Sequence, residues 1–69
     1  MIEFSLDDHE YIELNKLLKL MRMVNSGGEA NFHIDSGEVM VNNQTETQKR
    51  KKLRPGDIIS FNDKQIVIK

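Results

Sequence analysis

The spacing of apolar residues changes from a strand pattern to a helix pattern early in the chain. Ile2, Phe4 and Leu6 alternate with polar residues, and this period of two over a short span predicts an edge strand. From residue 14 onward the apolar spacing becomes i, i+3, i+4, i+7, which is typical of an amphipathic helix. The helical positions are Leu14, Leu17, Leu18 and Met21, flanked by Leu20 and Val24. We therefore predict a first helix that begins at Leu14.

A short polar turn separates this helix from a second one. Ser26 and Glu29 fit a capping box, in which the serine hydroxyl accepts from the N–H of Glu29 and the carboxylate accepts from that of Ser26. Ala30 and Ile34 mark the buried side of the second helix, and Gly37 is expected to end it in the left-handed conformation. The two helices should form a helix-turn-helix-like pair.

Alternation returns in the second half of the chain and predicts a small sheet. Strands are expected at residues 38–42, 44–48, 57–61 and 65–68. Asn42-Asn43 suits a two-residue type I′ turn, Pro55-Gly56 suits a type II turn, and Asn62-Asp63 marks a further turn. The predicted fold class is α+β, with two helices packed on a mostly antiparallel sheet and Leu53 returning to the core.

Length and composition limit the chain to one small domain, spanning residues 1–69. With 38% hydrophobic and 30% charged residues it reads as soluble and globular, and we expect a stability of only a few kcal/mol. The absence of cysteine excludes disulfides and thiolate metal sites. No apolar run approaches the ~20 residues of a membrane helix, and no secretory leader pattern is present, so we expect a cytoplasmic protein.

The net charge of −1 conceals a strong segregation of charge along the chain. Residues 1–13 carry five acids and no base, whereas residues 49–54, which we call the basic run, carry five bases. The exposed face of the first helix should carry Lys16, Lys19 and Met23, with Arg22 at its border. Cations gathered in this way can neutralise phosphates and release counterions, so the pattern favours a polyanionic ligand.

The order of these features resembles a known family. Residues 14–61, LNKLLKLMRMVNSGGEANFHIDSGEVMVNNQTETQKRKKLRPGDIISF, are similar to the RNA-binding domain named after small-subunit ribosomal protein four. Within that superfamily the chain most resembles the small stand-alone YbcJ-like proteins. The residues that carry the resemblance are Leu17-Leu18-Lys19, Ser26 to Ala30, Ile34, Gly37, Val39, Val41-Asn42, Glu46-Thr47 and Gly56-Asp57.

The resemblance implies the αL fold and a continuous surface that binds structured RNA, either ribosomal or transfer RNA. The residues implied in RNA binding are Lys16, Lys19, Arg22, Ser26, Gly27, Gly28, Asn31, Lys49, Arg50, Lys51, Lys52 and Arg54. Two of them depart from the family pattern, because the superfamily often has Arg at the position of Gly27 and Lys or Arg at that of Asn31. Because of these departures the second helix brings less positive charge, so we expect the basic run to contribute most of the affinity for RNA.

Catalytic chemistry has little support in the sequence. His9 and His33, without cysteine, provide no trusted spacing for a metal, and the cap role already explains Ser26. Gly27-Gly28 is not followed by the Gly-Lys-Ser/Thr of a phosphate-binding loop. We therefore expect no enzymatic activity, no cofactor and no metal.

Two other functions remain open from the sequence. One is a protein-interaction module, for example a ribosome-associated factor that uses the acidic N-terminal segment and Phe32. Phe32 is expected either to pack on a neighbouring loop or strand or to stack on an unpaired base. The other is a duplex-DNA binder, although the second helix has no Lys or Arg for a major groove. We expect a monomer, with exposed strand edges leaving dimerisation open.

Overall fold

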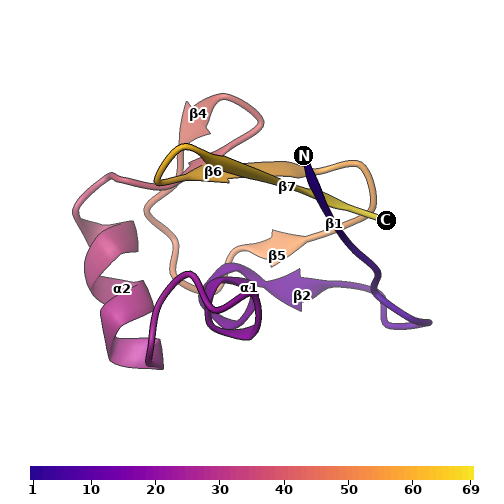
Figure 1. Ribbon diagram of the computed structural model, residues 1–69, viewed down its shortest axis with the longest axis horizontal. Coiled ribbons are helices and arrows are strands. Elements are labelled where there is room, and N and C mark those ends of the chain that lie inside the picture. The colour runs from indigo at the N-terminus through magenta and orange to yellow at the C-terminus, as the bar shows by residue number, and fades with distance from the viewer.

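A five-stranded sheet covers the two helices and a two-stranded ribbon in a two-layer α+β fold (Figure 1). This arrangement comes from a computed structural model that describes residues 1–69 and confirms the predicted fold class. The elements in chain order are β1 (Ile2–Phe4), β2 (Ile12–Glu13), α1 (Leu14–Leu20), α2 (Gly27–Asp35), β3 (Met40–Val41), β4 (Gln44–Thr45), β5 (Lys52–Leu53), β6 (Ile58–Phe61) and β7 (Lys64–Ile68).

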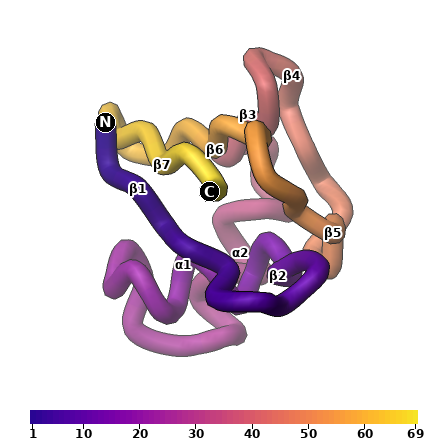
Figure 2. Tube along the Cα trace, turned by 90° about the vertical axis from the view of Figure 1, so that its right-hand side faces the viewer, coloured from indigo at the N-terminus to yellow at the C-terminus, as the bar shows by residue number.

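The large sheet has the strand order β1-β7-β6-β3-β4 (Figure 2). Its pairs are antiparallel except for β1, which lies parallel to β7 at one edge, as predicted for the first strand. The β3–β4 turn has φ values of 52° at Asn42 and 68° at Asn43, and the β6–β7 turn repeats this with 53° at Asn62 and 65° at Asp63. Asparagine and aspartate tolerate positive φ, so both predicted turns are confirmed as local features.

The second helix begins and ends where its sequence predicts. The Ser26 hydroxyl accepts a hydrogen bond of 3.1 Å from the N–H of Glu29, whereas the reciprocal bond from the Ser26 N–H to the Glu29 carboxylate is not formed. Gly37 adopts φ 76°, and its N–H donates to the carbonyl of Ile34 while that of Glu38 donates to His33. These two bonds define a Schellman motif that ends α2.

The first helix ends earlier than its apolar spacing predicts. It stops at Leu20, and Arg22 adopts φ 58°, so Arg22 does not lie on the helix. The N–H of Arg22 donates to the carbonyl of Lys19 and that of Met23 donates to Leu18, which forms a second Schellman motif without a glycine. The predicted surface position of Met23 is wrong, because this reversal turns its side chain onto the core.

Fifteen residues are buried, and every one is hydrophobic. The fully buried members contributed by the helices are Leu14, Leu17, Leu18, Ala30 and Ile34, as their spacing predicts. Leu20 is 58% exposed, because it lies on the side of α1 that faces solvent.

Neither helix has the length and apolar character needed to cross a membrane.

The structure adds two strands, β2 and β5, to those predicted and shortens two others. Ile12 and Glu13 form β2, which pairs antiparallel with β5 through Ile12–Leu53 and Glu13–Lys52. The strands predicted at 38–42 and 44–48 contract to two residues each. For β2 and β5, two residues are too few to show alternation, so only their pairing across the chain defines them.

Candidate RNA-binding surface

The basic run is attached to the beginning of α1 through its main chain. The N–H of Leu14 donates to the carbonyl of Lys51 at 2.9 Å, and the N–H of Asn15 donates to that of Lys49 at 3.0 Å. The first N–H groups of a helix have no partner inside it, and the N-cap residue Glu13 forms no side-chain cap. Main-chain carbonyls of the basic run therefore cap α1 and place the two cationic segments side by side.

One face of α2 lies toward both of these segments. Gly27, Asn31 and Asp35 are spaced four residues apart and so share a face of the helix. The side-chain amide of Asn15 donates to Asn31 Oδ1 at 3.2 Å, which joins this face to α1. Lys49 Nζ lies 3.1 Å from Asp35 Oδ2, which joins it to the basic run. The basic run, the start of α1 and this face of α2 consequently form a continuous surface, which we call the αL surface.

Two peptide N–H groups at the beginning of α2 remain free to bind an anion. Ser26 uses its hydroxyl for Glu29, while the amides of Gly27 and Gly28 have no partner within the protein. A Cβ atom added at Gly27 would meet no atom within 4 Å, so this corner of the αL surface is open. Free amides in the first turn of a helix, aligned with its dipole, suit a phosphate group.

Two cations of the basic run rest on an aromatic ring that is not among the predicted RNA-binding residues. Lys52 Nζ lies 5.0 Å from the centre of the Tyr11 ring, and Arg54 Cζ lies 5.7 Å from it. Exposed cation–π contacts contribute about 0.5–1 kcal/mol each, enough to favour one orientation of a long side chain. The only sequence signal is an aromatic residue before β2, and the contact depends on the β2–β5 pairing.

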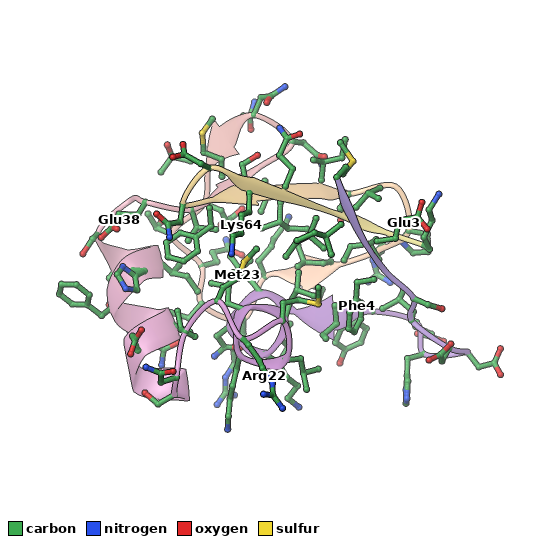
Figure 3. The ribbon with its side chains drawn as sticks, in the orientation of Figure 1. Glu3, Phe4, Arg22, Met23, Glu38 and Lys64 are labelled. Atoms are coloured by element: carbon green, nitrogen blue, oxygen red, sulfur yellow. The ribbon has the colours of Figure 1, made fainter.

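The remaining predicted residues surround this arrangement. Lys19 follows Asn15 by four residues, so it lies on the stripe of α1 that faces α2, whereas Lys16 lies on the neighbouring stripe near Tyr11. Arg22, just past the end of α1, points away from the large sheet (Figure 3). Arg50 is exposed and Lys51 is half-buried.

Phe32 lies outside the αL surface. Its side chain is 63% exposed and meets the edge of the His33 ring, with ring centroids 5.4 Å apart. The prediction that Phe32 packs on a neighbouring loop or strand is therefore wrong. His33 lies at the edge of the core, where its ring contacts Phe61 and its Nδ1 bonds Glu38 Oε1 at 3.1 Å.

Fold and sequence together place the chain in a family. The model of the S4 domain matches residues 4–69, so the protein belongs to the S4 domain family. YbcJ of Escherichia coli (strain K12) is 43% identical over 61 residues, which cover 88% of this chain and 87% of YbcJ. RlbA of Bacillus subtilis (strain 168), whose name describes a probable ribosome maturation protein, is 35% identical over 54 residues, covering 78% of this chain and 76% of RlbA.

A solved structure supports the same assignment. The solution structure of YbcJ from E. coli aligns with a TM-score of 0.74 and 38% identity, covering 99% of this chain and 86% of that one. It is described as revealing an αL motif involved in RNA binding. The resemblance noted in the sequence is therefore confirmed.

Proposed function

We propose that this protein binds structured RNA, of the ribosomal or transfer class, through the αL surface. The observation that carries the proposal is the pair of main-chain hydrogen bonds from Leu14 and Asn15 to the basic run. Because these bonds involve the backbone, the cations stay beside α1 whatever their side chains contact. A preformed cationic surface binds a polyanion with less loss of conformational entropy than a flexible loop.

Each part of the surface has a separate role in the proposed complex. The basic run neutralises phosphates along one strand, Lys19 and Arg22 meet the opposite strand, and the amides of Gly27 and Gly28 hold one phosphate between them. Tyr11 orients Lys52 and Arg54. A-form RNA presents a wide, shallow minor groove between its phosphates, and a rigid surface recognises that shape without reading many bases.

The proposed activity is binding without catalysis, by a monomer in the cytoplasm, and it needs no cofactor. Duplex DNA is a poor ligand for this surface. The second helix, which would have to enter a major groove, carries Glu29, Asn31 and Asp35 and no Lys or Arg.

A salt-titrated binding assay tests the proposal. A ribosomal RNA hairpin with an internal loop, a transfer RNA and a DNA duplex of equal length are compared by fluorescence anisotropy. We expect both RNAs to bind more tightly than DNA, with log K falling against log salt at a slope of roughly −3 to −5 for about five phosphates. Equal affinity for DNA, or no RNA binding at low salt, would contradict the proposal.

Gly27→Arg is expected to increase RNA affinity. The added side chain enters open space on the αL surface and places a cation beside the free amides at the start of α2. One more phosphate contact should strengthen binding roughly three- to tenfold at low salt and steepen the salt slope by about 0.7–0.9. The matched control is Gly27→Ala, which makes the same backbone change without charge. Affinities that are equal for the two variants would show that RNA does not reach this corner.

A further inference from the structure

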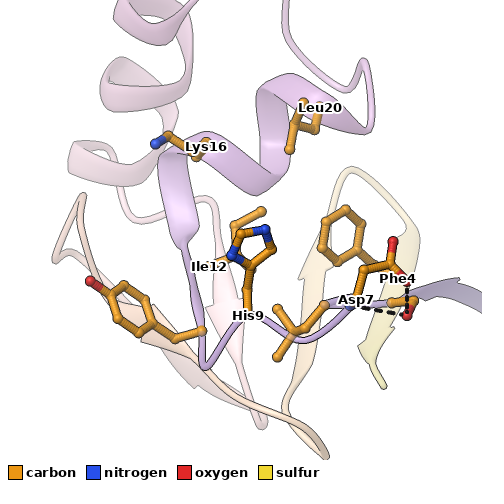
Figure 4. A pocket seen from close by; sticks show the side chains of 9 residues that line it. Phe4, Asp7, His9, Ile12, Lys16 and Leu20 are labelled. Atoms are coloured by element: carbon orange, nitrogen blue, oxygen red, sulfur yellow. Dashed lines mark hydrogen bonds between the residues drawn. The ribbon is translucent and has the colours of Figure 1, made fainter.

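A partly apolar groove lies on the other side of α1 from α2 (Figure 4). It has a volume of about 390 Å³ and runs between the segment that follows β1 and the exposed side of α1. Its apolar walls are Phe4, Leu6, Ile12, Tyr11 and Leu20. The volume falls within the ~300–1,000 Å³ of pockets that bury ligand groups, so the groove can hold apolar side chains of a partner.

Two of the apolar side chains in the groove are exposed to solvent. Leu20 is 58% exposed and Tyr11 is 38% exposed, although fifteen other hydrophobic residues are buried. Leu20 follows Lys16 by four residues and shares its stripe of α1, while Asn15 and Lys19 form the stripe that faces α2. The groove therefore lies on a different stripe of α1 from the one that faces α2, and the two surfaces meet at Lys16 and Tyr11.

Acids outnumber bases around the groove. Asp7 and Lys16 line it, and Glu10 and Glu13 lie beside Lys16 at its end. Lys52 and Arg54 lie over the Tyr11 ring at its margin. Asp7 and Asp8 adopt φ values of 48° and 74°, in a turn that exposes both carboxylates. Neither of these carboxylates, nor that of Glu10, forms a salt bridge within the protein. The surplus of carboxylates at this end of the groove attracts a cationic partner.

We propose that the groove binds a basic amphipathic helix of a partner protein, with its apolar side chains against Leu20 and Phe4 and its Lys or Arg side chains toward Asp7, Asp8 and Glu10. Apolar anchors at i, i+3 and i+4 are the usual means by which a helix occupies such a groove. The inference does not depend on RNA binding.

The probe is a synthetic helical peptide of about 14 residues, or four turns, with Leu at the i, i+3, i+4, i+7 positions and Lys elsewhere. A second peptide carries Glu in place of every Lys. Binding to the full chain is measured by fluorescence anisotropy without RNA, and amide chemical shifts locate the contact. We expect the Lys peptide to bind and to shift amides of residues 4–12 and 16–20, and the Glu peptide to remain unbound.

Variants with matched controls define the groove. Leu20→Ser should weaken peptide binding at least about fivefold, because a solvent-exposed anchor is lost. Asp7→Asn with Glu10→Gln should weaken it roughly threefold at low salt, whereas Glu38→Gln with Asp63→Asn, which removes the same charge elsewhere, should not. Phe32→Ser, which removes another exposed apolar side chain, should have no effect.

The results separate this inference from RNA binding. Leu20→Ser is expected to leave the affinity for RNA unchanged, so a loss of peptide binding alone supports a second surface. Failure of the Lys peptide to bind, equal binding of the Glu peptide, or insensitivity to Leu20→Ser would overturn the proposal, as would chemical-shift changes confined to residues 49–54.

Discussion

Reversal of the charges in the basic run is expected to abolish RNA binding while the protein stays folded. The variant replaces Lys49, Arg50, Lys51 and Lys52 by Glu. We expect at least about a 100-fold loss of affinity at moderate salt, because several phosphate contacts are lost and four repulsive charges take their place. Fluorescence anisotropy against the ribosomal RNA hairpin measures the loss, and circular dichroism establishes that the variant is folded.

The fold is expected to survive because the main-chain contacts of this segment do not use its charges and its charged contacts are exposed. Carbonyl oxygens of Lys49 and Lys51 cap α1, and these remain in glutamate. The side-chain ion pair between Lys49 and Asp35 is 45% and 55% exposed, so its loss costs at most about 1 kcal/mol. In the proposed RNA complex, a phosphate takes the place of Asp35 as the partner of Lys49.

Equal changes of net charge provide the control for this experiment. Arg50→Glu with Lys51→Glu alters the αL surface, while Lys64→Glu with Lys69→Glu places the same charge on β7 and the residue after it. We expect the first pair to weaken binding strongly and the second to weaken it slightly through long-range repulsion. Equal losses from the two pairs would mean that total charge governs binding, and an unaffected quadruple variant would exclude the basic run from the interface.

Leu53→Ala is expected to have the largest effect on stability among single changes near the site. Leu53 is fully buried in β5, opposite Ile12 of β2, and its truncation should lower the free energy of unfolding by about 2–5 kcal/mol. A domain of this size has a total of roughly 3–10 kcal/mol, so a large part of its stability is lost. Urea unfolding followed by circular dichroism measures the change.

Leu20→Ala removes the same atoms from a side chain that is 58% exposed. We expect it to cost less than about 1 kcal/mol, because little apolar surface becomes newly exposed. Similar midpoints of unfolding for the two variants would contradict the central position of Leu53 in the core. Such a result would also mean that the packing of Leu53 does not position Lys52 of β5 against Tyr11.

The sequence by itself determined the elements whose causes are local. The apolar spacing of the helices, the Ser26 cap, the Gly37 ending and the paired asparagine turns depend on residues within a few positions of one another, and the structure contains all of them. The end of α1 was not predicted, because no residue with a local signal marks it. Its Schellman motif uses Arg22 where a glycine would have signalled it, so the pattern alone favoured a longer helix.

The tertiary structure decided how the site is assembled. Neither the pairing of β2 with β5 nor the bond between Asn15 and Asn31 has a local signal, because the partners lie far apart in sequence. The same holds for Tyr11 beneath Lys52 and Arg54. The sequence therefore determined that the chain carries cationic segments and two helices, together with the family resemblance they imply. Long-range pairing decided that these segments form one surface, with a partly apolar groove beside it. Contacts between distant residues form only when the whole chain folds, because each of them requires a long loop to close.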